Sequence, residues 1–237
     1  LNLPSIWFEI QLNAPGVNTY GVSLPGAPGV IIGFNEKVAW GVTNVGADVQ
    51  DWYQIKFKDQ SRKQYFHDST WKSTTSVVEE IKVRGQEPVT ETIYYTHHGP
   101  VALLKNDTSL AGSETFADVP VGYAMRWEAA NPANEFITFH KLNRAENYDD
   151  YVKALKPYSC PAQNFCFISV DKDIALWANG RFPLRWEGQG KYLLDGSDPS
   201  HDWQGYLPHA HNPHIKNPER GFVSSANQHS TAQDYPY

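Results

Sequence analysis

The sequence predicts an α+β fold in which strand outweighs helix. Stretches rich in β-forming residues, punctuated by Pro and Gly, fill the first third of the chain. Two segments with helical periodicity follow in the middle, and strands return after them. The 237 residues suffice to bury a sizeable core, as one large domain or two small ones.

The expected strands are mostly antiparallel. Residues 5–14 alternate, and residues 21–43 continue the pattern with Asn35 to Lys37 as a short hairpin loop. Further strands are expected within residues 51–57, 73–85 and 89–103. Their spacing indicates a large, mostly antiparallel sheet system.

Two helices are expected within residues 131–155. The first has Asn134 as N-cap and Glu135 in its first turn. One face of it should carry Phe136, Phe139, His140 and Leu142. The second begins near Asn147 and ends at Pro157, which cannot continue a helix. Its apolar positions are Tyr148, Tyr151, Val152 and Leu155.

Strands return in residues 163–170 and 173–179, joined at Asp171 to Asp173, and the chain after Gly180 is rich in loops. The formal charge of −6 and the lack of a basic run exclude nucleic acid as a partner. No apolar run reaches membrane-spanning length, so the piece is expected to be soluble. The sequence contains no phosphate-binding or dinucleotide-binding motif, so no organic cofactor is expected.

The segment Ala47 to Asp51 has the chemistry of a cation loop. The carboxylates of Asp48 and Asp51 and the carbonyl of Gln50 are oxygen ligands of the kind that Ca²⁺ takes. From spacing alone, two Asp residues after a turn are more often helix or turn caps, or solvated loop tips.

Other polar residues have two interpretations each. Asn164, on an otherwise apolar strand, is either a structural amide or an N–H donor aimed at an oxyanion. The cluster of His209, His211 and His214 could bind zinc, but it is better explained as histidines of a surface loop. The pair His97–His98, within Thr96 to Pro100, is interpreted as part of a turn that ends a strand. Cys160 and Cys166 are buried free thiols, one small disulfide loop or, with less support, a nucleophile.

Four segments in order resemble the penicillin acylase family of N-terminal-nucleophile hydrolases. They are "LPSIWFEIQL", "PGAPGVIIGFNEKVAWGVTNVGADVQDWY", "AQNFCFISVDKDIALWANGRFPLR" and "NPERGFVSSANQ". The resemblance implies stacked helix, sheet, sheet and helix layers. It also implies a precursor that cleaves itself into α and β chains. The first residue of the β chain, usually Ser, is then nucleophile and, through its α-amine, general base.

The resemblance also assigns roles to residues. The backbone N–H of Asn44 and the side-chain amide of Asn164 match the two oxyanion donors. Arg185 matches an arginine near the nucleophile, and Val42 and Ile32 match positions that line the acyl pocket.

A structural Ca²⁺ is a further implication of the resemblance. Asp48, Gln50 (through its carbonyl) and Asp51 match the calcium loop of the family, and Asp173 is chosen as a further carboxylate ligand. An exported protein, periplasmic or secreted, would favour a bridge between Cys160 and Cys166.

The nucleophile expected from the resemblance falls upstream of Leu1. The chain is therefore interpreted as an interior fragment of the β chain, whose partners are the α chain and the remaining β chain. Alone it is expected to be inactive. The expected substrate is a small-molecule amide: a penicillin-like β-lactam, an N-acyl homoserine lactone or an N-acyl amino acid. The first of these would imply a role in antibiotic biosynthesis or resistance. The alternative is a relative without a nucleophile that acts as a binding scaffold.

Overall fold

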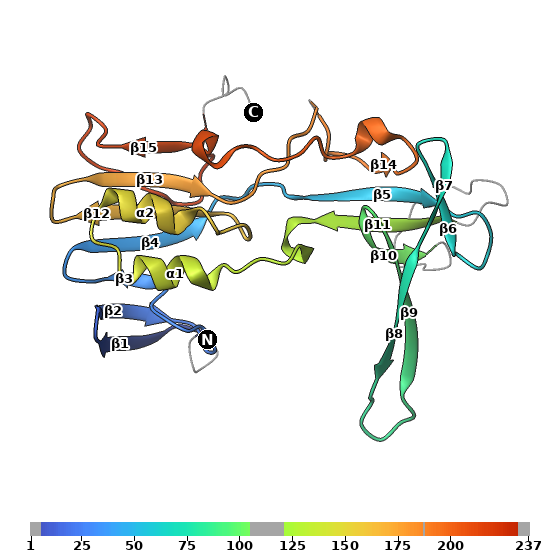
Figure 1. The fold of residues 1–237 in the computed structure, drawn as a ribbon, viewed down its shortest axis with the longest axis horizontal. Coiled ribbons are helices and arrows are strands. Elements are labelled where there is room, and N and C mark those ends of the chain that lie inside the picture. Colours follow the sequence, from blue (N-terminus) through green and yellow to red (C-terminus); the bar gives the residue numbers. More distant parts are fainter. Residues whose placement is uncertain (1–5, 105–120, 187, 232–237) are drawn as a thin grey trace. The chain divides into compact units, whose positions relative to one another are not determined.

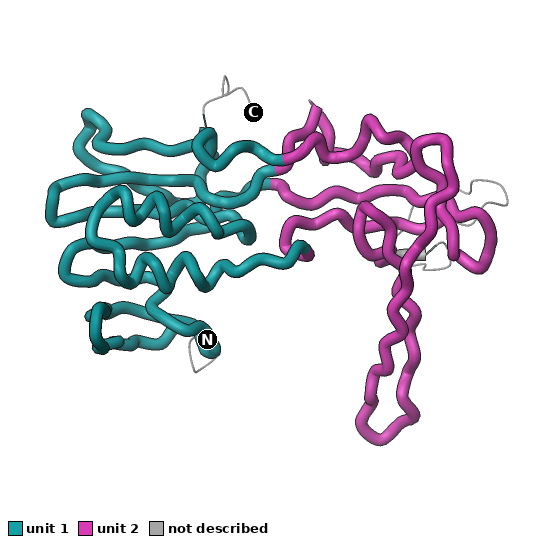
Figure 2. The backbone as a smooth tube through the Cα atoms, in the orientation of Figure 1, with its two compact units in different colours: residues 1–47, 131–182, 206–237 teal, residues 48–130, 183–205 magenta. Residues whose placement is uncertain are grey.

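The computed structural model describes residues 6–104, 121–186 and 188–231. The chain divides into two compact units, coloured teal and magenta in Figure 2. Unit 1 comprises residues 1–47, 131–182 and 206–237, and unit 2 comprises residues 48–130 and 183–205. Both units consist mainly of antiparallel strands, which confirms the predicted fold class.

Unit 1 is built on a seven-stranded sheet in the order β1-β2-β3-β4-β12-β13-β15, antiparallel throughout (Figure 1). Its strands are β1 (Phe8–Ala14), β2 (Val17–Ser23), β3 (Ile32–Phe34), β4 (Val38–Asn44), β12 (Gln163–Ser169), β13 (Ile174–Asn179) and β15 (His214–Lys216). The predicted hairpins at 35–37 and 171–173 are confirmed, because β3 pairs with β4 and β12 pairs with β13.

Two glycines allow β2 and β3 to pair closely. Gly21 lies opposite Gly33 in the ladder. A Cβ atom on Gly21 would lie 2.1 Å from the carbonyl oxygen of Ile32, and one on Gly33 would lie 2.2 Å from that of Tyr20. Any side chain here would therefore push the two strands apart.

Two helices cover one face of this sheet, α1 (Phe136–Leu142) and α2 (Tyr148–Leu155) (Figure 1). The helix α2 begins near Asn147 as predicted, and Asn147 caps it, since its side chain accepts a hydrogen bond from the N–H of Asp150 at 2.9 Å. The prediction of Asn134 as N-cap of α1 with Glu135 in its first turn is wrong, because Glu135 is the N-cap and α1 begins at Phe136. The side chain of Asn134 accepts from the N–H of Ile137 at 3.3 Å. The 3₁₀ turn η3 (His209–His211) also belongs to unit 1.

The main core of unit 1 lies between the helices and the sheet. Its fully buried members include Leu142, Tyr151, Leu155 and Phe165. The predicted face of α2 is confirmed, whereas that of α1 is wrong in two positions: Phe136 and His140 are exposed. A seven-residue helix has room for few inward positions, and Thr138, Phe139 and Leu142 take them.

Cys160 and Cys166 are each partly exposed, and no disulfide joins them. The bridge expected from the resemblance does not form in this structure. Burial raises the pKa of the Cys166 thiol, which disfavours the nucleophilic thiolate.

Unit 2 holds a six-stranded sheet in the order β14-β5-β11-β10-β9-β8 and a two-stranded ribbon, β6-β7. Its strands are β5 (Gln50–Lys56), β6 (Gln64–His67), β7 (Thr70–Ser73), β8 (Thr75–Ile81), β9 (Val89–Thr96), β10 (Gly99–Leu104), β11 (Val121–Trp127) and β14 (Leu194–Asp195). The 3₁₀ turns are η1 (Glu128–Ala130) and η2 (Pro199–His201). Among the described strands of unit 2, β14 alone pairs in parallel, with β5. The buried core of unit 2 includes Tyr53, Ile55, Phe57 and Tyr65. No helix among the described residues is long and apolar enough to cross a membrane.

Asn143, directly after α1, holds the loop before β3. Its side-chain oxygen accepts from the N–H of Val30 at 3.0 Å, and its amide nitrogen donates to the carbonyl of Val30 at 2.8 Å. Its own carbonyl accepts from the hydroxyl of Thr19 at 2.9 Å. Asn143 and Val30 are both buried, so water cannot supply hydrogen bonds to the backbone of Val30. The side chain of Asn143 supplies them instead.

We expect Asn143→Ala to destabilise the protein by about 2 to 4 kcal/mol. Both polar backbone groups of Val30 lose their partners, and a buried unsatisfied group costs roughly 1–3 kcal/mol. Urea unfolding of the full-length protein measures the change. The control is Asn13→Ala at an exposed asparagine, expected within about 0.5 kcal/mol of wild type. Equal effects of the two variants would contradict this role for Asn143.

Candidate functional site

Asn164 lies on β12, one of the central strands of unit 1, and its residue surface is 2% exposed. In the ladder it lies opposite Thr43 of β4. Its neighbour Phe165 belongs to the core under the helices. Because side chains alternate along a strand, Asn164 and Thr43 lie on the other face of the sheet. Asn164 thus lies on the face of the sheet opposite to the one that α1 and α2 cover.

The amide of Asn164 has a fixed orientation. Its nitrogen donates to the backbone carbonyl of Asn44 at 3.2 Å, and its oxygen accepts from the hydroxyl of Ser230 at 3.2 Å. A carboxamide carries two N–H donors, and the carbonyl of Asn44 takes one of them. Among the described residues, the second N–H of Asn164 has no acceptor, so it is available to another group.

Asn44 ends β4 opposite Gln163. The N–H of the next residue, Val45, donates to the carbonyl of Ala162 at 3.2 Å. Hydrogen-bonded and non-hydrogen-bonded pairs alternate in an antiparallel ladder, so the pair Asn44–Gln163 is a non-hydrogen-bonded one. The N–H of Asn44 therefore lies outside the β4–β12 ladder, as an oxyanion donor requires. The group of Asn44 that Asn164 contacts is the carbonyl, and the roles of Asn164 and of the Asn44 N–H as oxyanion donors stay predictions.

A C-terminal segment covers this polar face, and sequence reasoning did not assign it a role. The hydroxyls of Ser225 and Thr43 lie 2.5 Å apart, and the amide nitrogen of Asn227 donates to the carbonyl of Asn44 at 2.8 Å. With Ser230 on Asn164, three side chains of residues 225–230 hold the site. The only signal in the sequence was "SSANQ", which carried part of the family resemblance.

Val42 and Ile32, predicted to line the acyl pocket, are partly buried and pack against the core of unit 1. Val42 lies opposite Phe165, on the helix-covered face, whereas Asn164 lies on the other face. A role in an acyl pocket stays a prediction for both residues.

The predicted calcium loop brings Asp48 and Asp51 of unit 2 together around Arg185. The guanidinium donates through Nε to Asp51 Oδ2 at 2.9 Å and through Nη1 to the carbonyl of Asp48 at 2.8 Å. Nη1 also lies 3.3 Å from Asp48 Oδ2. The indole N–H of Trp203 donates to Asp51 Oδ2 at 2.5 Å. Within unit 2, Arg185 thus contacts both Asp residues of the predicted calcium loop, and its expected place near the nucleophile stays a prediction.

Two observations fit a cation between these carboxylates. Asp51 Oδ1 is buried and has no hydrogen-bond partner in the described part of the chain. A Cβ atom on Gly190 would lie 2.9 Å from Asp48 Oδ2 and 3.0 Å from Asp51 Oδ1, so a side chain there would fill the space beside both oxygens. Buried carboxylate oxygens require a donor or a cation.

The other two predicted ligands have different surroundings. The N–H of Gln50 donates to Asp48 Oδ1 at 3.2 Å, and the role of its carbonyl stays a prediction. Asp173 belongs to unit 1, where its carboxylate accepts from Asn217 at 2.7 Å and pairs with Lys216 at 3.0 Å. These two contacts, Asn217 first, lower the pKa of Asp173.

The histidines that the sequence singled out separate into two groups. His209 and His214 stack on Trp177 in unit 1, with ring centroids 5.0 and 4.0 Å away. The pair His97–His98 does connect two strands, β9 and β10. In addition it meets His67 and Asp202, which no local motif had connected with it.

The whole chain resembles known proteins of one family. The model of the family described as Penicillin amidase matches residues 1–237. The acyl-homoserine lactone acylase QuiP of Pseudomonas aeruginosa is 32% identical over 98% of this chain. The penicillin G acylase of Escherichia coli is 24% identical, also over 98%. The chain spans 28% and 26% of the lengths of these two relatives.

A solved structure has the same fold. The thermostable penicillin G acylase from Alcaligenes faecalis matches 98% of this chain with a TM-score of 0.79 at 22% sequence identity. The match covers 40% of that protein. The fold expected from the resemblance, that of the N-terminal-nucleophile hydrolases, is therefore confirmed.

We expect Asp51→Asn to destabilise the protein far more than Asp48→Asn. The side chain of Asp51 is fully buried against Arg185, and removing one partner of a buried ion pair costs about 3–5 kcal/mol. The side chain of Asp48 is 57% exposed, and an exposed pair contributes about 0–1 kcal/mol. Thermal unfolding of both variants in the full-length protein measures the difference. Similar losses in the two would contradict the assigned weight of the Asp51–Arg185 pair.

Proposed function

Because the chain belongs to the penicillin amidase family, we propose that it supplies the oxyanion-stabilising groups of an amide hydrolase. The observation that carries the proposal is the arrangement of Asn164 and Asn44. The amide of Asn164 is buried, oriented by Ser230 and left with one N–H, next to the strand end where the N–H of Asn44 lies outside the ladder. Two such donors are what a tetrahedral intermediate of acyl transfer requires.

In the proposed reaction, a nucleophile outside this chain attacks the carbonyl carbon of an acyl amide. The electron pair of the C=O bond moves onto the oxygen, where the N–H groups of Asn164 and Asn44 stabilise the negative charge. When the intermediate collapses, the C–N bond breaks, the amine leaves with a proton from the general acid, and the acyl group remains on the nucleophile. Water then attacks this acyl-enzyme through a second oxyanion, its proton passes to the general base, and the carboxylic acid and the free nucleophile are released. The α-amine of an N-terminal Ser, Thr or Cys suits the base and acid roles, since its pKa lies near neutrality.

The proposed substrate is an amide that joins an acyl group to a small amine. Relatives named for acyl-homoserine lactones are 31–32% identical to this chain, and those named for penicillin are 24–26% identical. An N-acyl homoserine lactone is therefore the first substrate to assay, with penicillin G for comparison.

We expect Asn164→Ala to lower kcat by roughly a hundred- to a thousandfold with a much smaller change in KM, since a lost oxyanion donor acts in the transition state. Ser230→Ala leaves the amide in place without its orienting bond, so its loss of kcat should be smaller. The exposed variant Asn13→Ala is the inert control. Steady-state kinetics of the self-processed, full-length protein gives these values.

Unchanged kcat in Asn164→Ala would contradict the proposed role of this amide. Hydrolysis by the 237-residue chain alone would contradict a nucleophile located outside it. If the full-length protein does not hydrolyse any acyl amide, the alternative of a binding scaffold takes precedence.

The proposal includes a structural Ca²⁺ held by Asp48, the carbonyl of Gln50 and Asp51. The partnerless Asp51 Oδ1 and the space beside Gly190 support it. Bound there, Ca²⁺ would supply positive charge to the carboxylates and fix the segment that follows Asn44 in the chain.

After all metals are removed, we expect added Ca²⁺ to raise the melting temperature of wild type and to leave that of Asp51→Asn nearly unchanged, because the variant loses an anionic ligand. Differential scanning fluorimetry of the full-length protein measures both shifts. An equal rise in the two proteins would place the ion elsewhere.

A further inference from the structure

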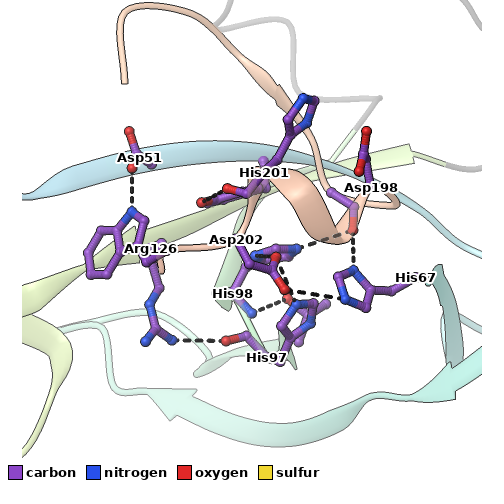
Figure 3. A network of polar contacts seen from close by, with 12 residues as sticks. Asp51, His67, His97, His98, Arg126, Asp198, His201 and Asp202 are labelled. Atoms are coloured by element: carbon purple, nitrogen blue, oxygen red, sulfur yellow. Dashed lines mark hydrogen bonds and ion pairs between the residues drawn. The ribbon is translucent and has the colours of Figure 1, made fainter. Parts of the chain in front are cut away.

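Four metal-ligating side chains of unit 2 converge from three separate segments (Figure 3). His67 ends β6, His97 and His98 form the turn between β9 and β10, and Asp202 follows η2. One ligand atom from each lies within 4.8 Å of those of the other three. His67 and His98 are buried, at 3% and 2% exposed, so the group is not a chance cluster of surface residues.

The imidazoles all direct a nitrogen at the carboxylate of Asp202. His67 Nε2 lies 3.4 Å from Oδ2, and His97 Nε2 and His98 Nδ1 lie 3.4 and 3.7 Å from Oδ1. Ligand atoms on a tetrahedral zinc ion are roughly 3.3 Å apart, given metal–ligand distances of about 2.0–2.1 Å. The three distances to Asp202 are close to that value, and the four ligand atoms together lie within 4.8 Å of one another, so the side chains must move closer to hold the ion.

The carbonyl of Gly196 fixes two of the tautomers. His67 Nδ1 lies 2.9 Å and His98 Nε2 lies 3.2 Å from this oxygen, which can only accept. Each of these nitrogens therefore carries a proton. In a neutral imidazole the other nitrogen is then unprotonated, and in both rings that is the one that faces Asp202.

His97 has a comparable outer partner. Its Nδ1 lies 2.9 Å from the hydroxyl of Tyr65, which also accepts a hydrogen bond from the N–H of His97 at 3.3 Å. With Nδ1 protonated and donating to Tyr65, Nε2 presents its lone pair to Asp202. Metal-bound histidines commonly donate their second N–H to a protein oxygen, which orients the ring.

The environment favours neutral rings. Burial, followed by the nearby His97, lowers the pKa of His98 to about 2. Burial and the neighbouring His67 lower the pKa of His97, although Asp202 acts in the opposite direction. In the tautomers that these outer partners favour, the inner nitrogens of His67, His97 and His98 all face the Asp202 carboxylate, which is the arrangement of donor atoms that a bound cation requires.

We propose that His67, His97, His98 and Asp202 bind a zinc ion. Three imidazole nitrogens and one carboxylate oxygen form the four-coordinate set that Zn²⁺ takes in proteins, whereas Ca²⁺ and Mg²⁺ prefer oxygen ligands alone. The guanidinium of Arg126, which donates to the carbonyl of His97 at 2.9 Å, is the nearby positive charge that opposes binding. Asp202 supplies the compensating negative charge.

The ion has a route to its ligands. A pocket of about 150 Å³ is lined by His97, His98 and Asp202 together with Tyr53, Arg126 and Trp203. The side chains of His97 and Asp202 are 34% and 32% exposed. Bound zinc would fasten β6, the β9–β10 turn and the segment after η2 to one another, so its role is to stabilise unit 2.

The test is zinc binding by the metal-stripped, full-length protein, followed by elemental analysis and by the visible spectrum of the Co²⁺ form. We expect His97→Gln and Asp202→Asn each to bind one zinc fewer per chain than wild type and to lose the tetrahedral Co²⁺ absorption. Tyr65→Phe should weaken zinc binding by roughly ten- to a hundredfold, because it removes only the outer partner of His97. His140→Gln, at an exposed histidine of α1, should bind as wild type does.

His97 is the most exposed ligand, so its variant is the one best suited to remain folded, and its melting temperature without metal verifies this. Added zinc should raise the melting temperature of wild type and of Asp51→Asn, but not that of His97→Gln. Wild-type zinc content and Co²⁺ spectrum in a folded His97→Gln, or no zinc bound by wild type at micromolar concentration, would overturn the proposal.

Discussion

The pairing of β4 with β12 is the interaction on which the candidate site depends. The two strands are more than a hundred residues apart in sequence, and their register sets Asn164 opposite Thr43 and Gln163 opposite Asn44. A slip of one residue would turn Asn164 towards the helices and move Phe165 out of the core. The apolar residues that hold the register therefore also determine where the polar face and its donors lie.

Several buried polar groups of both units are held by partners from distant segments. Asn143 holds Val30, Ser230 orients Asn164, and Arg185 pairs with Asp51. Such contacts contribute modestly to stability but cost much when one partner is removed. Asp51 Oδ1 is one of several buried side-chain atoms that have no hydrogen-bond partner in the described residues, and Arg185 Nη2 is another. The Asp51 carboxylate and the group around Asp202 are the two places where we propose a cation.

Local features of the fold were predictable from sequence. The hairpins at 35–37 and 171–173, the start of α2 near Asn147 and the apolar face of α2 depend on residues a few positions apart. The inward face of α1 was not, because the short helix is placed by the sheet beneath it and not by its own periodicity. The fold class itself followed from the pattern of strands and helices.

The candidate sites were predictable only in part. Asn44, Asn164, Asp48 and Asp51 occur in ordered motifs, and the structure brings them together in two pairs, one in each unit. The partners Ser230 and Trp203 could not be found, since they lie 66 and 152 positions from the residues they contact. For the same reason the sequence showed the pair His97–His98 as a turn, without His67 or Asp202.

The most direct test of the central claim is a crystal structure of the full-length protein with a boronate or phosphonate analogue of the tetrahedral intermediate. The account predicts that the analogue's oxyanion lies about 2.7–3.1 Å from both Asn164 Nδ2 and the backbone nitrogen of Asn44. An oxyanion held by other donors, with Asn164 still bonded only to the carbonyl of Asn44, would contradict it.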